Sequence, residues 1–240
     1  MSSIAPRRSA RRSRFASSIR SLAPALARIA PFALFLAFLA VQPLLEPTLD
    51  ARWIAVARGL AVAALLAYFW RHYTELKRPG AVPVPAREWA LAMFLGIAVF
   101  GAWITFDSGW AAFESRGPGF VPLRPDGTLD PALVALRLCA LALVVPVMEE
   151  LFWRSFLMRW IGKREFLAAD PRKVGLVAFG ISSALFASEH ALWFAGLLAG
   201  LAYGWTYLRT GNLWVPIVSH AITNGLLGVW ILATQNWRYW

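Results

Sequence analysis

Residues 131–158 read PALVALRLCALALVVPVMEELFWRSFLM, a long apolar stretch that contains two adjacent acids and, four residues after the second, an arginine. A helix needs about 20 mainly apolar residues to cross roughly 30 Å of hydrocarbon. Ionisable side chains are costly at that depth and generally mark functional sites. The stretch therefore predicts a membrane helix in which Glu149, Glu150 and Arg154 belong to a functional site.

Six further apolar runs accompany this one. They cover residues 29–45, 53–70, 88–106, 174–190, 193–208 and 213–233. Only 15% of the chain is charged and 59% is hydrophobic, whereas soluble domains carry about 25% charged residues. Several tryptophans lie at run ends, as in the aromatic belts of membrane proteins. We expect an all-α, polytopic transmembrane bundle of about seven spans, with an extramembrane loop at 107–130.

The formal charge of +11 does not indicate nucleic-acid binding. The cations lie at run ends and in an N-terminal arm, rather than on one face of a soluble domain. With the N-terminus in the cytoplasm, the inner segments hold 17 Lys and Arg and the outer segments hold 4. Cytoplasmic loops of membrane proteins are enriched in these residues. The asymmetry predicts a cytoplasmic N-terminus.

Cys139 is the only cysteine, which excludes an internal disulfide.

The chain divides into three parts by composition. Residues 1–28 contain seven arginines and no acid. Such a segment could be a presequence or a twin-arginine signal, but it lacks a convincing cleavage site and we expect a disordered cytoplasmic arm. Residues 29–128 hold the first helices and the loop, and residues 129–240 hold the remaining helices with the polar residues of interest.

Two later groups of polar residues also fall in apolar runs: Glu189 with His190, and His220 with Asn224. Glu150 and Arg154 are four apart, so they share a helix face and can pair. Glu149 lies about 100° around the helix and can face another neighbour. His220 and Asn224 share a face in the same way. Pro146 removes a backbone hydrogen bond just before the acids and should loosen the helix there.

These residues can form one site only if they lie at similar depths in the membrane. Counted from Pro131, Glu149 lies about 27 Å down the helix, too far from His190 for the two to meet. If Arg137 marks the membrane boundary instead, Glu149 lies about 18 Å deep and the groups can converge. Glu189 could face the outer interface, so we leave it out of the predicted site. Gly196, Gly200 and Gly204 share one face of the sixth run and predict close helix packing.

The order of these motifs resembles the CPBP family, which includes the CAAX prenyl endopeptidases. The resemblance rests on Glu149-Glu150-Leu-Phe-Trp-Arg154, Phe186-Ala-Ser-Glu-His190 and His220-Ala-Ile-Thr-Asn224, and it covers about residues 130–235. It implies that residues 129–240 are a catalytic transmembrane core. The C-terminal stretch 232–240 also resembles a bacterial subgroup associated with exosortase protein-sorting systems, which implies a bacterial inner-membrane protein.

The resemblance implies an intramembrane endopeptidase. Peptide hydrolysis needs an activated water and donors for the tetrahedral oxyanion. Glu149 would be the general base and His190 would hold the water. His220 and Asn224 would form the oxyanion site. Glu150 and Arg154 would stabilise the motif helix, although that pair and Asn224 could also be purely structural.

The residues leave two alternatives for the metal requirement and indicate only the class of substrate. Glu149, His190 and His220 could bind zinc, but the chain has no HExxH motif and we favour a metal-free, glutamate-activated water with no cofactor. We expect a membrane-anchored protein or peptide as the substrate, and the lipid bilayer as the other partner. A non-catalytic immunity or scaffold protein is one alternative. A proton-coupled transporter is another, but such folds contain inverted repeats and we find none.

Overall fold

The computed structural model describes residues 7–77, 84–113 and 119–240, and of residues 7–22 it describes the backbone alone. Parts of the expected arm (residues 1–6), of the segment between the second and third apolar runs (78–83) and of the loop (114–118) lie outside the described residues. The described part is helical and contains no strand, which confirms the all-α bundle.

The helices follow the seven apolar runs. They are α1 (Arg7–Leu45), α2 (Ala51–Tyr68), α3 (Thr74–Lys77), α4 (Ala86–Thr105), α5 (Pro131–Cys139), α6 (Val145–Glu150), α7 (Arg159–Gly162), α8 (Leu176–Ser188), α9 (Trp193–Thr210) and α10 (Trp214–Thr234). By length and apolarity, α1 from Ala23, α2, α4, the continuous stretch Pro131–Gly162 and α10 can cross a membrane. Helix α8 is apolar but only 13 residues long. The count of seven spans and the cytoplasmic N-terminus therefore stay predictions.

Local sequence signals set several helix ends. The side chain of Asp130 accepts hydrogen bonds from the backbone N–H groups of Ala132 and Leu133, and Pro131 is the first residue of α5. Both features are favoured at helix N-termini. Gly211 follows α9 with φ 67°, in the left-handed region that favours glycine.

The long helix that carries the acids is not uniform. Between α5 and α6 it is π-helical at Ala140–Val144, and between α6 and α7 it is π-helical at Leu151–Met158. Pro146 lies at the start of α6, directly after the first π segment. It was expected to loosen the helix at this point, because proline cannot donate the backbone hydrogen bond. The wide turns on either side of Glu149 and Glu150 are of the kind often found at functional sites.

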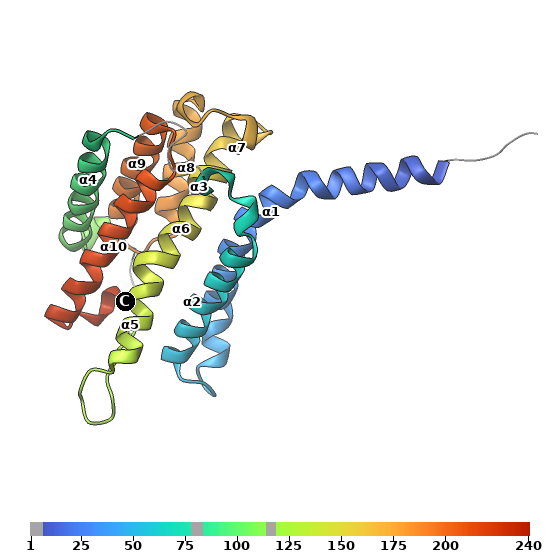
Figure 1. Ribbon diagram of the computed structural model, residues 1–240. Helices are drawn as coiled ribbons and strands as arrows, with labels where there is room; N and C mark the ends of the chain where they lie inside the picture. Colours follow the sequence, from blue (N-terminus) through green and yellow to red (C-terminus); the bar gives the residue numbers. More distant parts are fainter. Residues whose placement is uncertain (1–6, 78–83, 114–118) are drawn as a thin grey trace, which may run out of the picture.

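The helix with the two π segments lies in the middle of the bundle. Figure 1 shows α5 and α6 between the α1–α2 pair on one side and α4, α9 and α10 on the other. Helices α8 and α9 pack closely through the predicted glycine face. A Cβ on Gly200 would lie 2.9 Å from the carbonyl oxygen of Ser183, and one on Gly196 would lie 3.2 Å from the Cβ of His190. The small residues therefore allow α9 to hold α8, and with it His190, against the core.

The segment that was expected to be a disordered arm is helical from Arg7 onward in the structure. Helix α1 begins at Arg7, and its first part projects away from the bundle (Figure 1). Arg28 is fully buried and pairs with Glu75, its Nη2 lying 2.5 Å from Oε2. It also donates from Nε to the hydroxyl of Ser155 at 3.0 Å, and Ser155 donates to Glu75. The arginine thus connects α1 to α3 and to the second π segment, because a buried cation needs a charged partner.

Candidate functional site

Glu149 and Glu150 are adjacent in the chain and contact different partners. Both are buried, with 6% and 0% of their surface exposed. Glu150 Oε2 lies 3.1 Å from Arg154 Nε, which is the pair expected from their spacing. Glu149 is turned toward the histidines instead, and its Oε2 lies 4.0 Å from Nε2 of His220. The two carboxylates therefore have separate environments although they are neighbours in sequence.

Glu150 has a second partner that the spacing alone does not reveal. His220 Nδ1 lies 3.0 Å from Glu150 Oε1. Since a carboxylate oxygen accepts, the imidazole donates from Nδ1 and its Nε2 is directed away from Glu150. The ring also stacks on Tyr203, with centroids 4.8 Å apart. Glu150 and Tyr203 thus set the orientation of His220 from two sides.

Arg154 is held in place by aromatic rings as well as by Glu150. It is 1% exposed, and its guanidinium carbon lies 4.3 Å from the ring centroid of Phe186 and 5.6 Å from that of Tyr203. Phe186 itself is 1% exposed and contacts Trp153 and both site histidines. Phe186 therefore packs among the site residues. Stacked aromatic faces stabilise a desolvated cation in such a place.

Glu149, Glu189 and His190 converge on one point of the bundle. One atom from each residue that could bind a metal, a carboxylate oxygen or an imidazole nitrogen, lies within 4.8 Å of the other two. Glu189 accepts a hydrogen bond from the indole N–H of Trp153 at 2.9 Å, which turns it toward the site rather than toward the outer interface. The structure therefore brings together the predicted base and the predicted water-holding histidine, despite the depth problem. Glu189 is an addition that the sequence reasoning omitted.

The tautomer of His190 follows from its backbone contact. Its Nδ1 lies 2.7 Å from the carbonyl oxygen of Phe186, one turn earlier in α8. A carbonyl accepts, so Nδ1 carries the proton and Nε2 of the neutral ring is an acceptor. Trp103 contacts the ring edge-on at 5.4 Å. His190 can thus accept a hydrogen bond from a water molecule beside Glu149.

Asn224 lies in the same cavity but already has a partner. Its side-chain amide donates to the carbonyl oxygen of Leu141 at 3.0 Å. Leu141 belongs to the first π segment, where backbone carbonyls lose their usual helical partners. The amide of Asn224 therefore connects α10 to that segment. An amide nitrogen has two N–H groups, so one remains for a ligand in the cavity.

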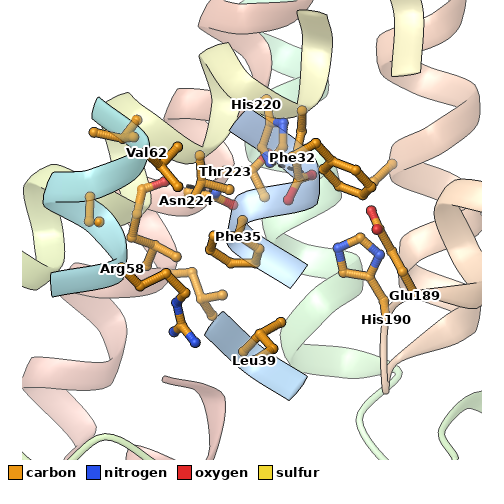
Figure 2. Close-up of a pocket in the computed structure, with 18 of the residues that line it drawn as sticks. Phe32, Phe35, Leu39, Arg58, Val62, Glu189, His190, His220, Thr223 and Asn224 are labelled. Atoms are coloured by element: carbon orange, nitrogen blue, oxygen red, sulfur yellow. Dashed lines mark hydrogen bonds and ion pairs between the residues drawn. The ribbon is translucent and has the colours of Figure 1, made fainter. Parts of the chain in front are cut away.

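One cavity of about 260 Å³ is lined by Glu149, Glu189, His190, His220 and Asn224. Figure 2 shows Glu189 and His190 on one side of it, His220, Thr223 and Asn224 across from them, and Phe35 and Leu39 of α1 along it. Farther along, two arginines line the same cavity, Arg58 of α2 and Arg137 of α5. The polar groups thus lie at one end of a largely apolar space.

Two features of this cavity were missed from sequence. Glu189 was set aside, yet it was an ionisable group at the end of an apolar run and next to a predicted site residue. Arg58 and Arg137 are also cations inside apolar runs; Arg137 was considered only as a possible membrane boundary, and Arg58 was given no role. In each case the signal was the cost of placing a charge in hydrocarbon.

The residues present could bind a divalent metal. In the described part of the chain, one possible ligand atom each of Glu149, Glu189 and His190 lie within 4.8 Å of one another. His220 is not in this group, although its Nε2 lies 4.0 Å from Oε2 of Glu149, so the predicted set of Glu149, His190 and His220 stays a prediction. Carboxylate oxygens and imidazole nitrogens are both ligands that zinc accepts. His190 also makes the backbone hydrogen bond that often orients a metal-binding histidine.

Comparison with known proteins agrees with this geometry. The family model described as type II CAAX prenyl endopeptidase Rce1-like matches residues 131–226, which include every predicted site residue. In the same comparisons no curated protein and no solved structure matches the chain. Within the matched region, Glu149, both membrane histidines and Asn224 line one cavity, and Glu150 contacts His220 beside it. The match supports the resemblance of residues 131–226 to the CPBP family, which includes the CAAX proteases.

Proposed function

We propose that this protein is an intramembrane endopeptidase that hydrolyses a peptide bond in a membrane-anchored protein by means of a glutamate-activated water. The observation that carries the proposal is the convergence of Glu149, Glu189 and the acceptor nitrogen of His190 within one cavity. A water molecule between Glu149 and His190 would have two acceptors for its two hydrogens. Positioned bases of this kind accelerate proton transfer by about 10² to 10⁴.

The proposed reaction proceeds in two steps. Glu149 removes a proton from the water as the oxygen attacks the scissile carbonyl carbon, which gives a tetrahedral oxyanion. The C–N bond then breaks, and Glu149 returns the proton to the leaving amine. The products are a carboxylic acid and an amine, and the acid then passes its proton to the amine to give a carboxylate and an ammonium group. Glu189, within reach of Glu149 and accessible from the cavity, is suited to exchange protons with it.

His220 and Asn224 are the proposed donors to the oxyanion. To donate from Nε2, His220 has to carry protons on both ring nitrogens, and the carboxylate of Glu150 on Nδ1 compensates that charge. Asn224 contributes the N–H that does not contact Leu141. Loss of one such donor typically lowers kcat by about 10²- to 10³-fold. Glu150 and Arg154 act through His220 and the helix, as positioning residues.

The reaction requires no metal in this proposal. A zinc ion held by Glu149, Glu189 and His190 would polarise the attacking water and lower its pKa, and one possible ligand atom of each residue lies within 4.8 Å of the others. The two versions predict different responses to chelators.

The decisive experiment compares Glu149→Gln with the native protein in native membranes and in detergent. Proteomics of membrane fractions should identify a fragment that is released by the native protein and by Glu165→Gln, a control acid in an exposed loop. Glu149→Gln should fold normally and release at least ~10²-fold less. If the fragment is released equally by Glu149→Gln, the protein is not this peptidase, and the immunity or scaffold function becomes the better reading.

We further infer that the protein resides in a bacterial inner membrane and acts beside an exosortase sorting system. The resemblance of residues 232–240 to that subgroup supports this setting. Deleting the gene should then alter the processing of exosortase substrates in inner-membrane fractions. Unchanged processing would separate the peptidase from that system.

A further inference from the structure

A separate cavity of about 560 Å³ is lined by residues of α3, of α7 and the segment after it, and of the end of α9. It shares no lining residue with the cavity that contains Glu149. Arg159, which lines it, is ten residues beyond Glu149 on the same long helix, or about 15 Å along it. Figure 1 shows α3 and α7 at the same end of the bundle. This cavity is therefore a different site from the proposed catalytic one.

Arg159 is the buried cation of this second cavity. It is 6% exposed, and no described carboxylate forms an ion pair with it. Its one side-chain hydrogen bond within the described residues is a long one, from Nη1 to the hydroxyl of Tyr207 at 3.5 Å, and its buried Nε has no partner there. By contrast, the buried Arg28 and Arg154 have acidic partners. A desolvated cation without a counter-ion costs free energy that a bound anion would recover.

Two further cations line the same cavity, and the acids beside them are already paired. The ammonium group of Lys77 donates once to a backbone carbonyl, at 2.7 Å, which leaves two of its N–H groups. Arg172 binds Asp170 through Nε and Nη2, and its Nη1 forms no hydrogen bond within the described part of the chain. Glu75, the other acid of the lining, is paired with Arg28. Positive charge is thus in excess around the cavity.

This lining suits a phosphate group. Guanidinium groups bind phosphate oxygens through two parallel N–H bonds, and an ammonium group binds them as a point charge. The exposed Leu167 adds an apolar edge to the cavity. Sites for small molecules typically have volumes of about 300–1,000 Å³. The cavity therefore has room for a phosphate ester as well as for the phosphate itself.

The position of the cavity favours a phospholipid as the source of that phosphate. Arg159 lies near the end of the membrane-length stretch Pro131–Gly162, and Thr210 is the last residue of α9. The segments around the cavity, 71–77, 159–173 and 209–212, are cytoplasmic in the topology that the charge pattern predicts. Basic pockets between helices on that side of a membrane bind anionic headgroups.

We propose that Arg159, Lys77 and Arg172 form a binding site for a phosphate group, supplied by the headgroup of an anionic phospholipid such as phosphatidylglycerol. The site is independent of the peptidase reaction and uses none of its residues. Occupancy by the lipid neutralises Arg159 and fixes α3, α7 and the end of α9 at the membrane surface. Inorganic phosphate has the same chemistry, and the test below distinguishes the two sources.

Ligand binding to the full chain in a neutral detergent tests the site. The probes are dihexanoyl phosphatidylglycerol, inorganic phosphate and, as a control for the acyl chains, dihexanoyl phosphatidylcholine, each followed by titration calorimetry. Phosphatidylglycerol should bind most tightly, and Arg159→Gln should weaken its binding by about 10- to 100-fold, as expected for charge-assisted hydrogen bonds. Lys77→Gln, at an exposed position, should weaken it by about 5-fold. Lys163→Gln removes an exposed cation that does not line the cavity and should leave the affinity unchanged.

Thermal stability provides a second readout. Because Arg159 has no acidic partner among the described residues, Arg159→Gln strands no carboxylate, and its melting temperature without lipid should be no lower than that of the native protein. Phosphatidylglycerol at about 100 times the native Kd should raise the native melting temperature by about 5–10 °C. The same concentration should raise that of Arg159→Gln by about half as much or less. If Arg159→Gln does not fold, Lys77→Gln carries the test.

The remaining outcomes decide the proposal. Inorganic phosphate that displaces the lipid and binds more tightly, with the same dependence on Arg159, would support the phosphate site and make a soluble phosphate its occupant. No binding of any probe, or equal affinities in the native protein, Arg159→Gln and Lys77→Gln, would overturn the site. Phosphatidylglycerol that binds no better than phosphatidylcholine would overturn it as well. So would an acidic peptide that binds through Arg159 more tightly than either phosphate probe.

Discussion

Replacing Glu150 by glutamine tests whether the two adjacent acids divide their work between chemistry and support. Glu150 is fully buried, lies 3.1 Å from Arg154 and accepts from His220 at 3.0 Å. The substitution preserves the volume of the side chain but removes its charge. Arg154, which is 1% exposed, would then be a buried cation without its acid.

Removal of one partner from a buried ion pair costs about 3–5 kcal/mol. For a chain of this length, 1 kcal/mol corresponds to roughly 2–4 °C in the melting temperature. Glu150→Gln should therefore lower the melting temperature in detergent by on the order of 10 °C. Adding Arg154→Met should recover part of that loss, because the unpaired charge is removed while an apolar side chain still packs on Phe186.

The same variants separate stability from positioning. Since His220 loses its carboxylate partner in both, fragment release should stay low in Glu150→Gln with Arg154→Met even after stability recovers. Glu149→Gln should show the opposite pattern, with a near-native melting temperature and almost no activity. A stable Glu150→Gln protein, or full activity in the stabilised double variant, would contradict the reasoning. An active Glu149→Gln together with an inactive but stable Glu150→Gln would reverse the two roles.

Three other predictions follow from the structure and the charge pattern. Chelators should leave fragment release unchanged in detergent, whereas stoichiometric zinc that is lost in Glu189→Gln, together with inactivation by chelators, would establish the metal-dependent version. Reporter fusions after residues 120 and 168 should report opposite sides of the membrane, and the same side for both would refute the proposed topology. At Glu75, burial by itself raises the carboxyl pKa, but the charge of Arg28 and the hydrogen bonds from Arg28 and Ser155 hold that pKa below its ordinary value of 4.5. The stability advantage of the native protein over Glu75→Gln should therefore be full above about pH 5 and should decline as the pH falls through the lowered pKa; an advantage that grew in acid would contradict this.

The sequence by itself determined the class of the protein and most of the site. Apolar runs of membrane length set the all-α bundle, because a chain in lipid has to satisfy its backbone hydrogen bonds within helices. The cost of charge in hydrocarbon singled out Glu149, Glu150, His190 and His220. Helical spacing was enough to pair Glu150 with Arg154, because residues four apart share a face.

Only the tertiary structure decided which groups meet across helices. Counting along straight helices placed Glu149 and His190 at different depths, whereas the π segments beside Glu149 and the short α8 bring them together. The hydrogen bond from Trp153 places the carboxylate of Glu189 in the site. Arg28, which the sequence assigned to the N-terminal arm, forms a buried ion pair with Glu75. Sequence periodicity describes the face of one helix, but the distance between two side chains on different helices depends on how those helices pack, and packing is set by the whole bundle.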